Sequence, residues 1–178
     1  MSVSRVIFVC HGNICRSPMG EYIFKKLVED AGVADRFIIT SAGVSSEEDG
    51  NDIYPPAKAM MRKKGIPFSY HRAHRITDRE FEDADYVLAL DSSNYRRLVS
   101  RFGESDKVSM LLDRDVDDPW YSGDFNTAFE DIYRGSSEFL KKVLSGNWWL
   151  ITFFSLIHIY SWDILKLDPL KVLRGFSL

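Results

Sequence analysis

The chain has 178 residues, of which 45% are hydrophobic and 28% are charged, and its formal net charge is -3. This length favours one globular domain with a hydrophobic core. The 26 acidic and 23 basic residues argue against general nucleic-acid binding, which needs a basic surface. Only two cysteines are present and no signal-peptide pattern precedes the first apolar run, so we expect a cytoplasmic protein without a disulfide framework.

The first apolar run, Val6 to Val9, predicts a buried strand that leads directly into a polar loop. This loop contains Gly12 and Asn13, which tolerate the backbone angles of a tight turn. Successive N–H groups of the loop can therefore point into one concavity and bind an anion. The loop consists of Cys10, His11, Gly12, Asn13, Ile14, Cys15, Arg16 and Ser17.

The end of this loop carries groups suited to phosphate chemistry. Ser17 as an N-cap and Pro18 at the first helical position predict a helix whose free N–H groups face the concavity. Arg16 can hold two phosphate oxygens with its planar guanidinium. A cysteine in such a place is expected to ionise readily, so Cys10 is a candidate nucleophile that attacks phosphorus. The alternative is a buried strand-end cysteine that only fills space.

Cys15 lies five positions after Cys10 in the same loop. One interpretation is a reversible disulfide between the two sulfurs, which would protect a reactive Cys10 from over-oxidation. The other is that Cys15 only packs beneath the loop. The residues leave both interpretations open.

Strands and helices alternate along the rest of the chain. Apolar residues at helical spacing predict helices, and β-branched or unbroken apolar runs predict strands. The expected elements after the loop are a helix at 18–31, a strand at 37–40, a surface loop at 45–52, a helix at 57–64, a helical turn at 77–81, a strand at 86–90, a helix ending near 102, a strand at 108–112, an acidic loop at 113–121 and a helix at 125–144. This alternation predicts an open α/β fold with parallel strands, whose ligands bind at the carboxyl ends of the strands.

Hydrolysis through a phosphorylated cysteine needs an acid for the leaving oxygen and then a base for the attacking water. The segment Asp117-Asp118-Pro119-Trp120-Tyr121 follows the last predicted strand and offers such a carboxyl group. Taken alone, an Asp-Pro pair in an acidic loop is usually only a turn.

Two motifs together resemble the low-molecular-weight protein tyrosine phosphatase family. The motifs are Cys10-x-Gly12-Asn13-x-Cys15-Arg16-Ser17-Pro18 and, much later in the chain, Asp118-Pro119-Trp120. The resemblance implies a phosphatase domain at 1–144 with a three-layer α/β fold, in which helices flank an open four-stranded parallel sheet. It further implies a cysteine-dependent phosphatase that hydrolyses phosphotyrosine in phosphorylated proteins through a phosphocysteine intermediate, with no metal or other cofactor.

The resemblance also implies roles for single residues. Cys10 would be the nucleophile, Arg16 the phosphate clamp and Asp118 the general acid and then the general base. The phosphate would be held by His11, Gly12, Asn13, Ile14, Cys15, Arg16 and Ser17.

A second group of residues would support the loop. By the same resemblance, Ser17 would donate a hydrogen bond to the Cys10 thiolate. Asn13 would hold the loop in its strained shape through a network with Ser41 and His71. For His71, a plain surface position is the alternative.

The walls of the substrate groove depart from the family pattern. His11 follows the nucleophile and Trp120 and Tyr121 follow the Asp-Pro pair, whereas Ser46, Glu47 and Glu48 stand where the family usually has a tryptophan. We therefore expect a groove that is more open, and more acidic on the Glu47 side. Members that act on phosphoarginine tend to have threonine at the position of His11, so this residue favours phosphotyrosine.

Three other functions are alternatives to a phosphotyrosine phosphatase. The first is a phosphoarginine phosphatase of the same family, and the second is a phosphocysteine carrier of a sugar-uptake system, which would not need Asp118. The third is an arsenate reductase, which needs further cysteines downstream, and none follows Cys15.

Residues 145–178 lie beyond the resemblance. The segment 148–162 contains no Asp, Glu, Lys or Arg, yet it is shorter than the roughly 20 apolar residues that span a bilayer. We expect this extension to pack on the domain or to mediate self-association. Contact with a membrane surface and a non-native chain end are the alternatives.

Overall fold

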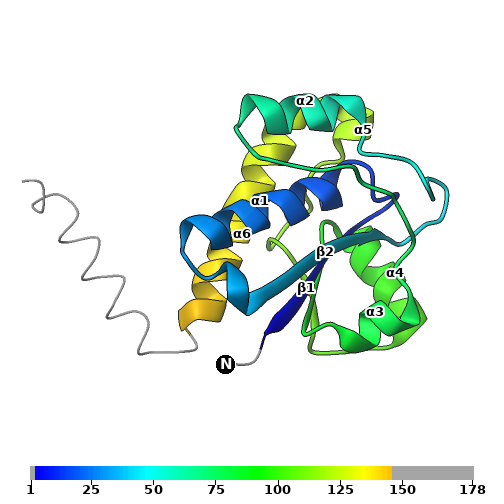
Figure 1. Ribbon diagram of the computed structural model, residues 1–178. Coiled ribbons are helices and arrows are strands. Elements are labelled where there is room, and N and C mark those ends of the chain that lie inside the picture. Colours follow the sequence, from blue (N-terminus) through cyan, green and yellow to red (C-terminus); the bar gives the residue numbers. More distant parts are fainter. Residues whose placement is uncertain (1–2, 146–178) are drawn as a thin grey trace, which may run out of the picture. The chain divides into compact units, whose positions relative to one another are not determined.

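The computed structural model describes residues 3–145, and within them four strands form one sheet (Figure 1). The strands are β1 (Ser4–Cys10), β2 (Phe37–Gly43), β3 (Tyr86–Ala89) and β4 (Val108–Met110). They lie in the order β2-β1-β3-β4, and each neighbouring pair is parallel. Helices pack on both faces of this sheet, which confirms the predicted three-layer α/β fold with an open four-stranded parallel sheet.

Strand β1 lies inside the sheet, and its residues 6–10 are buried because both of its faces are covered. Cys10 pairs in register with Gly43 at the carboxyl ends of β1 and β2. The loop that follows Cys10 therefore starts at the edge of the sheet where open α/β folds bind their ligands.

One face of the sheet is covered by α3 (Asp78–Asp83) and α4 (Ser92–Phe102). Phe81 and Phe102 stack there with ring centroids 4.0 Å apart. The buried residues of this layer are Ile7, Val9, Ala42, Val44, Ile76, Phe81, Ala84, Val87, Ala89, Leu98 and Val108. This core fixes the position of the helix that starts just after β3.

The opposite face packs against α1 (Arg16–Asp30) and α6 (Phe125–Ser145). Phe24 of α1 contacts Phe8 of β1, with ring centroids 5.7 Å apart, and also contacts Phe139 of α6. Gly20 lets α1 approach the sheet closely, because a Cβ atom there would lie 2.5 Å from the Phe8 ring. The first turn of α1 is thereby held against the end of β1.

Some helix ends lie close to their predicted positions. Helix α2 (Pro55–Lys63) starts two residues earlier than predicted, because the proline pair forms its first turn, and Gly32 ends the turn after α1 with a φ of 67°. Helix α3, close to the predicted helical turn at 77–81, starts with a capping box in which Thr77 and Glu80 exchange hydrogen bonds with each other's backbone.

Other local predictions are wrong. The acidic loop contains a helical turn, α5 (Pro119–Ser122), which starts because Asp118 accepts a hydrogen bond from the Trp120 N–H. A 3₁₀ turn, η1 (Ala34–Arg36), precedes β2 in a stretch for which no element was predicted. Strand β4 ends at Met110, two residues earlier than predicted, because Leu111 and Leu112 turn to pack on Gly135 of α6.

The predicted N-cap of the first helix is also wrong. Helix α1 begins at Arg16, and Cys15 occupies the N-cap position without a side-chain hydrogen bond. The Ser17 hydroxyl turns instead into the protein, where it reaches the Ala42 carbonyl at 3.1 Å. As a result, no side chain of residues 3–145 accepts a hydrogen bond from the first N–H groups of α1, and they stay available to a ligand.

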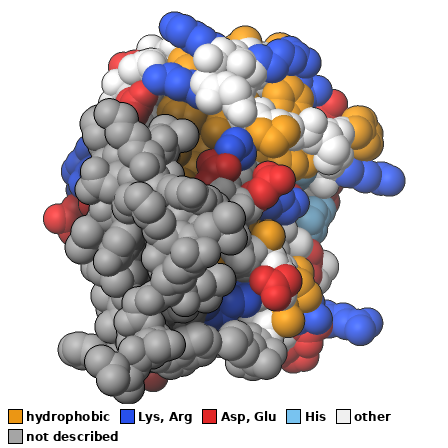
Figure 2. All heavy atoms as spheres, turned by 60° about the vertical axis from the view of Figure 1, so that its left-hand side comes forward, with side chains coloured by type: hydrophobic (Ala, Val, Ile, Leu, Met, Phe, Trp, Pro, Cys, Tyr) orange, Lys and Arg blue, Asp and Glu red, His pale blue; other side chains and the backbone are white. Residues whose placement is uncertain are grey.

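Positive and negative side chains are interspersed on the face of the molecule drawn in Figure 2, with hydrophobic side chains between them. Between residues 3 and 145, no helix is both long and apolar enough to cross a membrane. Apart from Ser145, the predicted extension 145–178 lies outside the described residues, and so does the segment 148–162.

Candidate active site

The loop between β1 and α1 exposes backbone donors and uses its carbonyl groups internally. The carbonyl oxygens of Cys10, His11 and Ile14 accept hydrogen bonds from the N–H groups of residues 44, 45 and 54, at 2.8 to 3.0 Å. No residue in the described part of the chain accepts a hydrogen bond from the N–H groups of 12–17. Asn13 has a φ of 60°, which is unusual for a residue other than glycine. The loop thus has the donor arrangement of an anion-binding nest.

The Cys10 sulfur lies at this loop and is only 3% exposed as a residue. Its Sγ is 3.0 Å from the Ser17 hydroxyl oxygen. Ser17 has one hydroxyl proton, so it donates either to the Ala42 carbonyl or to the sulfur, and not to both. A thiolate at Cys10 can accept this proton, whereas a neutral thiol can donate to Ser17.

Asn13 ties together the residues predicted to support the loop. Its side-chain amide donates to the Ser17 hydroxyl at 2.9 Å and to the Ser41 hydroxyl at 3.0 Å. The His71 Nε2 lies 2.8 Å from the Asn13 carbonyl oxygen, and His71 is only 8% exposed, so the surface alternative for it is wrong. The structure brings all four predicted support residues into one buried network.

Two members of this network were missed by sequence reasoning. Ser41 donates at 2.6 Å to Glu21, a buried carboxylate of α1 that also pairs with Lys25. The N–H of His74 donates to the Asn13 side-chain oxygen at 3.2 Å. Glu21 falls on an ordinary amphipathic helix and His74 acts through its backbone, so neither position carries a sequence signal.

The Arg16 guanidinium is buried and has three protein partners. It donates to Asp91 at 2.6 Å, to Asp118 at 2.5 Å and to the carbonyl oxygen of Val116 at 3.0 Å. Burial opposes its charge, but the nearby Cys10, Asp118 and Asp91 together raise the pKa of Arg16. The Arg16 Nε is buried and has no partner among the described residues, so one donor of the fork remains for a ligand oxygen.

Asp91 is a site residue that was not predicted. One of its oxygens accepts from the Asn94 N–H at 2.6 Å and so caps α4, and the other binds Arg16. Its position just after β3, next to β1 in the sheet, was the available signal, because neighbouring parallel strands end at the same edge.

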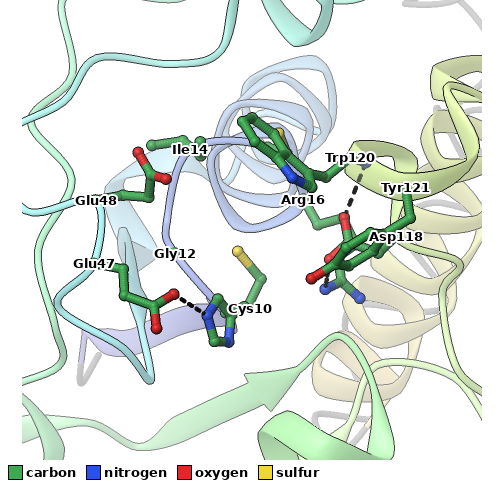
Figure 3. A pocket seen from close by; sticks show the side chains of 11 residues that line it. Cys10, Gly12, Ile14, Arg16, Glu47, Glu48, Asp118, Trp120 and Tyr121 are labelled. Carbon is green, nitrogen blue, oxygen red and sulfur yellow. Dashed lines mark hydrogen bonds and ion pairs between the residues drawn. The ribbon is translucent and has the colours of Figure 1, made fainter.

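Asp118 lies at the pocket on the side opposite Glu47 and Glu48, with Cys10 between them (Figure 3). One carboxylate oxygen caps α5 and the other contacts Arg16. The pocket has a volume of about 120 Å³. Its lining residues are Cys10, His11, Gly12, Ile14, Cys15, Arg16, Glu47, Glu48, Asp118, Trp120 and Tyr121. The side chains of Asn13 and Ser17 lie behind the loop instead.

The acidic side of the pocket is made by Glu47 and Glu48. The His11 Nε2 lies 2.8 Å from a Glu47 oxygen, and this hydrogen bond from His11 lowers the pKa of Glu47. Glu48 lies over Gly12, where a Cβ atom would come within 2.8 Å of the Glu48 side chain. Of the three residues at the expected tryptophan position, Glu47 and Glu48 line the pocket and Ser46 does not.

The aromatic side of the pocket is made by the α5 turn. The Trp120 ring packs on Tyr54, with centroids 4.8 Å apart, and Trp120 is 49% exposed. Tyr121 is 85% exposed at the mouth. An aryl group entering the pocket would therefore meet these two rings on one side and the carboxylates on the other.

Cys15 also lines the pocket, and both cysteines are free thiols. Burial, followed by the nearby charges of Cys10 and Asp118, strongly raises the pKa of the Cys15 thiol. Cys15 therefore stays protonated under conditions in which an accessible thiol would ionise.

Within residues 3–145, no group of three His, Cys, Asp or Glu side chains is placed to hold a metal ion. The groups that face a ligand in the pocket are the backbone N–H donors, the Arg16 guanidinium, the Cys10 sulfur and the Asp118 carboxyl. This set can hold an anion, attack it and exchange a proton with it.

Comparison with known sequences places these features in a family context. The family model described as low molecular weight phosphotyrosine protein phosphatase matches residues 5–146. The human protein of this description is 36% identical over 152 residues, which cover 77% of this chain and 94% of the human one. The low molecular weight protein-tyrosine-phosphatase YfkJ of Bacillus subtilis is 33% identical over 147 residues, with 78% and 94% covered.

Solved structures agree with this relationship. The crystal structure of YfkJ from Bacillus subtilis is similar with a TM-score of 0.79 and 32% identity, over 82% of this chain and 98% of that chain. The Drosophila arginine phosphatase DARP is similar with a TM-score of 0.71 and 29% identity, over 78% of this chain and 96% of its own.

Proposed function

This chain belongs to the low molecular weight phosphotyrosine protein phosphatase family, and we propose that it hydrolyses protein phosphotyrosine through a phosphocysteine intermediate. The observation that carries the proposal is the meeting of a thiol, a guanidinium and a carboxyl group at one nest of free N–H donors. These groups belong to Cys10, Arg16 and Asp118. The substrates are phosphorylated proteins.

In the first step, the phosphate dianion binds the N–H groups of the loop and the Arg16 guanidinium. The Cys10 thiolate attacks phosphorus, so that an S–P bond forms while the P–O bond to the tyrosine breaks. Asp118 in its protonated form gives its proton to the leaving phenolate oxygen. Dephosphorylated tyrosine leaves and the phosphoryl group stays on Cys10.

In the second step, the Asp118 carboxylate takes a proton from a water molecule. The water oxygen attacks phosphorus, the S–P bond breaks, and inorganic phosphate leaves. Ser17 supports this departure, because its hydroxyl, 3.0 Å from the sulfur, can donate to the thiolate as it forms.

Arg16 acts in both steps because charge builds up on the equatorial oxygens of the transferring phosphoryl group. The Arg16 guanidinium is held in place by a hydrogen bond to Asp91, and Asp91 is itself fixed as the N-cap of α4. Asn13, Ser41 and His71 keep the strained loop in shape, so that its N–H groups are already aimed at the ligand before it binds.

A phosphoarginine phosphatase is the second candidate. Glu47 and Glu48 put two carboxylates on one wall of the pocket. Carboxylates attract the charged guanidinium group of phosphoarginine more strongly than the phenol ring of phosphotyrosine. One similar structure is that of an arginine phosphatase. Trp120 and Tyr121 on the other wall favour the aryl substrate, and for this reason we rank phosphotyrosine first.

The two pocket cysteines also support a redox proposal. Peroxide oxidises the Cys10 thiolate to a sulfenic acid, and the Cys15 thiol then displaces water from it to form a disulfide. Because the Cys15 pKa is raised, this second reaction is slow near neutral pH. Reduction by an external thiol would restore the phosphatase.

We propose that residues 1–144 form the phosphatase domain and that 145–178 are an appended segment. The uncharged composition of 148–162 supports self-association through this segment, and membrane-surface contact is the alternative. A reducing compartment such as the cytoplasm suits two free pocket thiols.

The test is turnover of p-nitrophenyl phosphate, phosphotyrosine peptides and phosphoarginine peptides in the presence of a chelator. Cys10→Ser should abolish all turnover, and a rapid quench should trap phosphate on Cys10 of the wild type. Full activity in Cys10→Ser, or activity that depends on added metal, contradicts the mechanism. A trapped phosphoryl group that waits for a sugar acceptor would identify a carrier instead.

A further inference from the structure

A second cleft, of about 220 Å³, lies on the α4 side of the sheet and is not used by the mechanism above. Its floor is apolar and its rim is basic. The lining residues are Val44, Arg75, Ile76, Arg97, Leu98, Ser100, Arg101 and Phe102.

This cleft adjoins the active site through the segment that follows β2. The Val44 N–H donates to the Cys10 carbonyl oxygen at 2.9 Å, so a residue of the cleft floor is bonded to the nucleophile's own backbone. Arg75 is held at the same edge, because its backbone forms a bridge with Gly43 and donates to Asp49 at 3.0 Å. Val44 thus lines the cleft, while Glu47, three residues later, lines the active-site pocket.

The arginines of the cleft differ in what they bind. Arg101 is occupied, since it donates to the Ile76 carbonyl at 2.5 Å and to Asp78 at 2.7 Å. The side chains of Arg75 and Arg97 are exposed, and neither contacts a carboxylate within residues 3–145. Arg75 and Arg97 are therefore the two arginines of the cleft that remain for a ligand carboxylate.

We propose that the cleft binds an acidic side chain of the phosphoprotein substrate, with Arg75 and Arg97 as the groups that select it. The proposal rests on the proposed phosphatase function and adds a substrate class to it. The occupant is a glutamate or aspartate near the phosphotyrosine, whose methylene groups lie on the apolar floor while its carboxylate meets the two arginines.

The charges around the pocket make this preference depend on position. The chain as a whole has a net charge of -3, and Glu47 and Glu48 repel a carboxylate that lies directly beside the phosphotyrosine. A carboxylate further along the peptide can instead meet Arg75 and Arg97 in the cleft that Val44 also lines.

The experiment compares phosphotyrosine peptides in which one glutamate is moved through about four positions on either side, a reach of roughly 13 Å for an extended chain. Each peptide has a glutamine partner at the same position, and the readout is the ratio of their kcat/KM values. The variants are Arg75→Gln, Arg97→Gln and their combination. Arg5→Gln is the matched control, because Arg5 is an exposed arginine near the opposite, amino-terminal edge of the sheet.

We expect a glutamate advantage of about three- to tenfold at one or two positions, which is the size expected for a pair of exposed charge contacts. The double variant should lose this glutamate advantage, and Arg5→Gln should keep it. Arg97→Glu should instead hydrolyse peptides with lysine at the selected position faster than those with glutamate. Equal rates for glutamate and glutamine peptides throughout would overturn the proposal while p-nitrophenyl phosphate turnover still supports the phosphatase. An equal gain from leucine would show an apolar docking site and would overturn it too. Failure to hydrolyse p-nitrophenyl phosphate would contradict the phosphatase function, and the cleft proposal with it.

Discussion

Asp118 and Arg16 contact each other directly, with the Asp118 Oδ2 2.5 Å from the Arg16 Nη2. The proposed proton donor thus occupies the guanidinium that is proposed to hold phosphate. The Arg16 Nε has no partner among the described residues, so a phosphate bound there lies beside this carboxylate, which can then give its proton to the leaving oxygen. Substrate binding and placement of the acid are therefore one coupled event.

Replacing Asp118 by asparagine should separate these two effects. We expect kcat for p-nitrophenyl phosphate to fall by about 10²- to 10⁴-fold, because the positioned acid and base is lost. Inhibition by inorganic phosphate should not weaken, because a neutral amide competes less for Arg16. Asp117→Asn, at the exposed neighbouring residue, is the control and should keep its activity. Unchanged kcat in Asp118→Asn would refute its assigned role.

Asp91→Asn should weaken catalysis without unfolding the protein. Asparagine still caps α4, but it no longer supplies the charge that orients Arg16. A hydrogen bond to a charged group contributes about 1.5 to 3 kcal/mol, so kcat/KM should fall roughly ten- to hundredfold. Circular dichroism and thermal melts check the fold. A variant with normal kcat/KM would show that Arg16 is oriented without Asp91.

The anion-binding loop was predictable because its groups lie within eight consecutive residues, and the strands were predictable because burial on both faces requires unbroken apolar runs. Asp91 was missed as an Arg16 partner because the contact joins residues 75 positions apart. Ser17 was wrongly predicted as a helix cap, since a Ser-Pro pair has the same pattern whether its hydroxyl turns outward or, as here, toward Cys10 and Ala42. The end of β4 was misplaced because Leu111 and Leu112 continue the apolar run of the strand but pack on Gly135 of α6 instead of extending the sheet.

The two cysteines should differ in reactivity toward iodoacetamide. Burial raises the pKa of Cys15, so its thiol remains protonated and reacts slowly at neutral and mildly alkaline pH. Cys10 should be alkylated first, activity should be lost in step with it, and inorganic phosphate should protect. Peptide mass mapping against time measures both sites. Faster labelling of Cys15 would contradict the assignment of Cys10 as the reactive thiol.

His71 makes the support network sensitive to acid. Burial lowers the pKa of His71 below its ordinary value of 6.5, although the hydrogen bond to Asn13 opposes this shift. The folded protein therefore prefers the neutral ring, with its proton on Nε2. As the pH falls below about 6.5, His71 becomes protonated in the unfolded chain while it stays neutral in the folded protein. The free energy of unfolding therefore drops by up to about 1.4 kcal/mol per pH unit, until His71 is protonated in the folded protein as well.

The variant His71→Gln tests this dependence, because glutamine offers an N–H donor that does not titrate in this range. We expect the difference in unfolding free energy between wild type and variant to change with pH below about 6.5 and to stay constant above it. His74→Gln is the comparison, since the His74 ring is partly exposed and pairs with Glu80, while its backbone N–H, which the substitution keeps, donates to Asn13. The charge of His74 is only a smaller cause of the lowered His71 pKa, after burial. Urea titrations at several pH values give the free energies. If His71→Gln and wild type show parallel curves from neutral pH down to about 5, His71 does not carry the acid sensitivity of the loop.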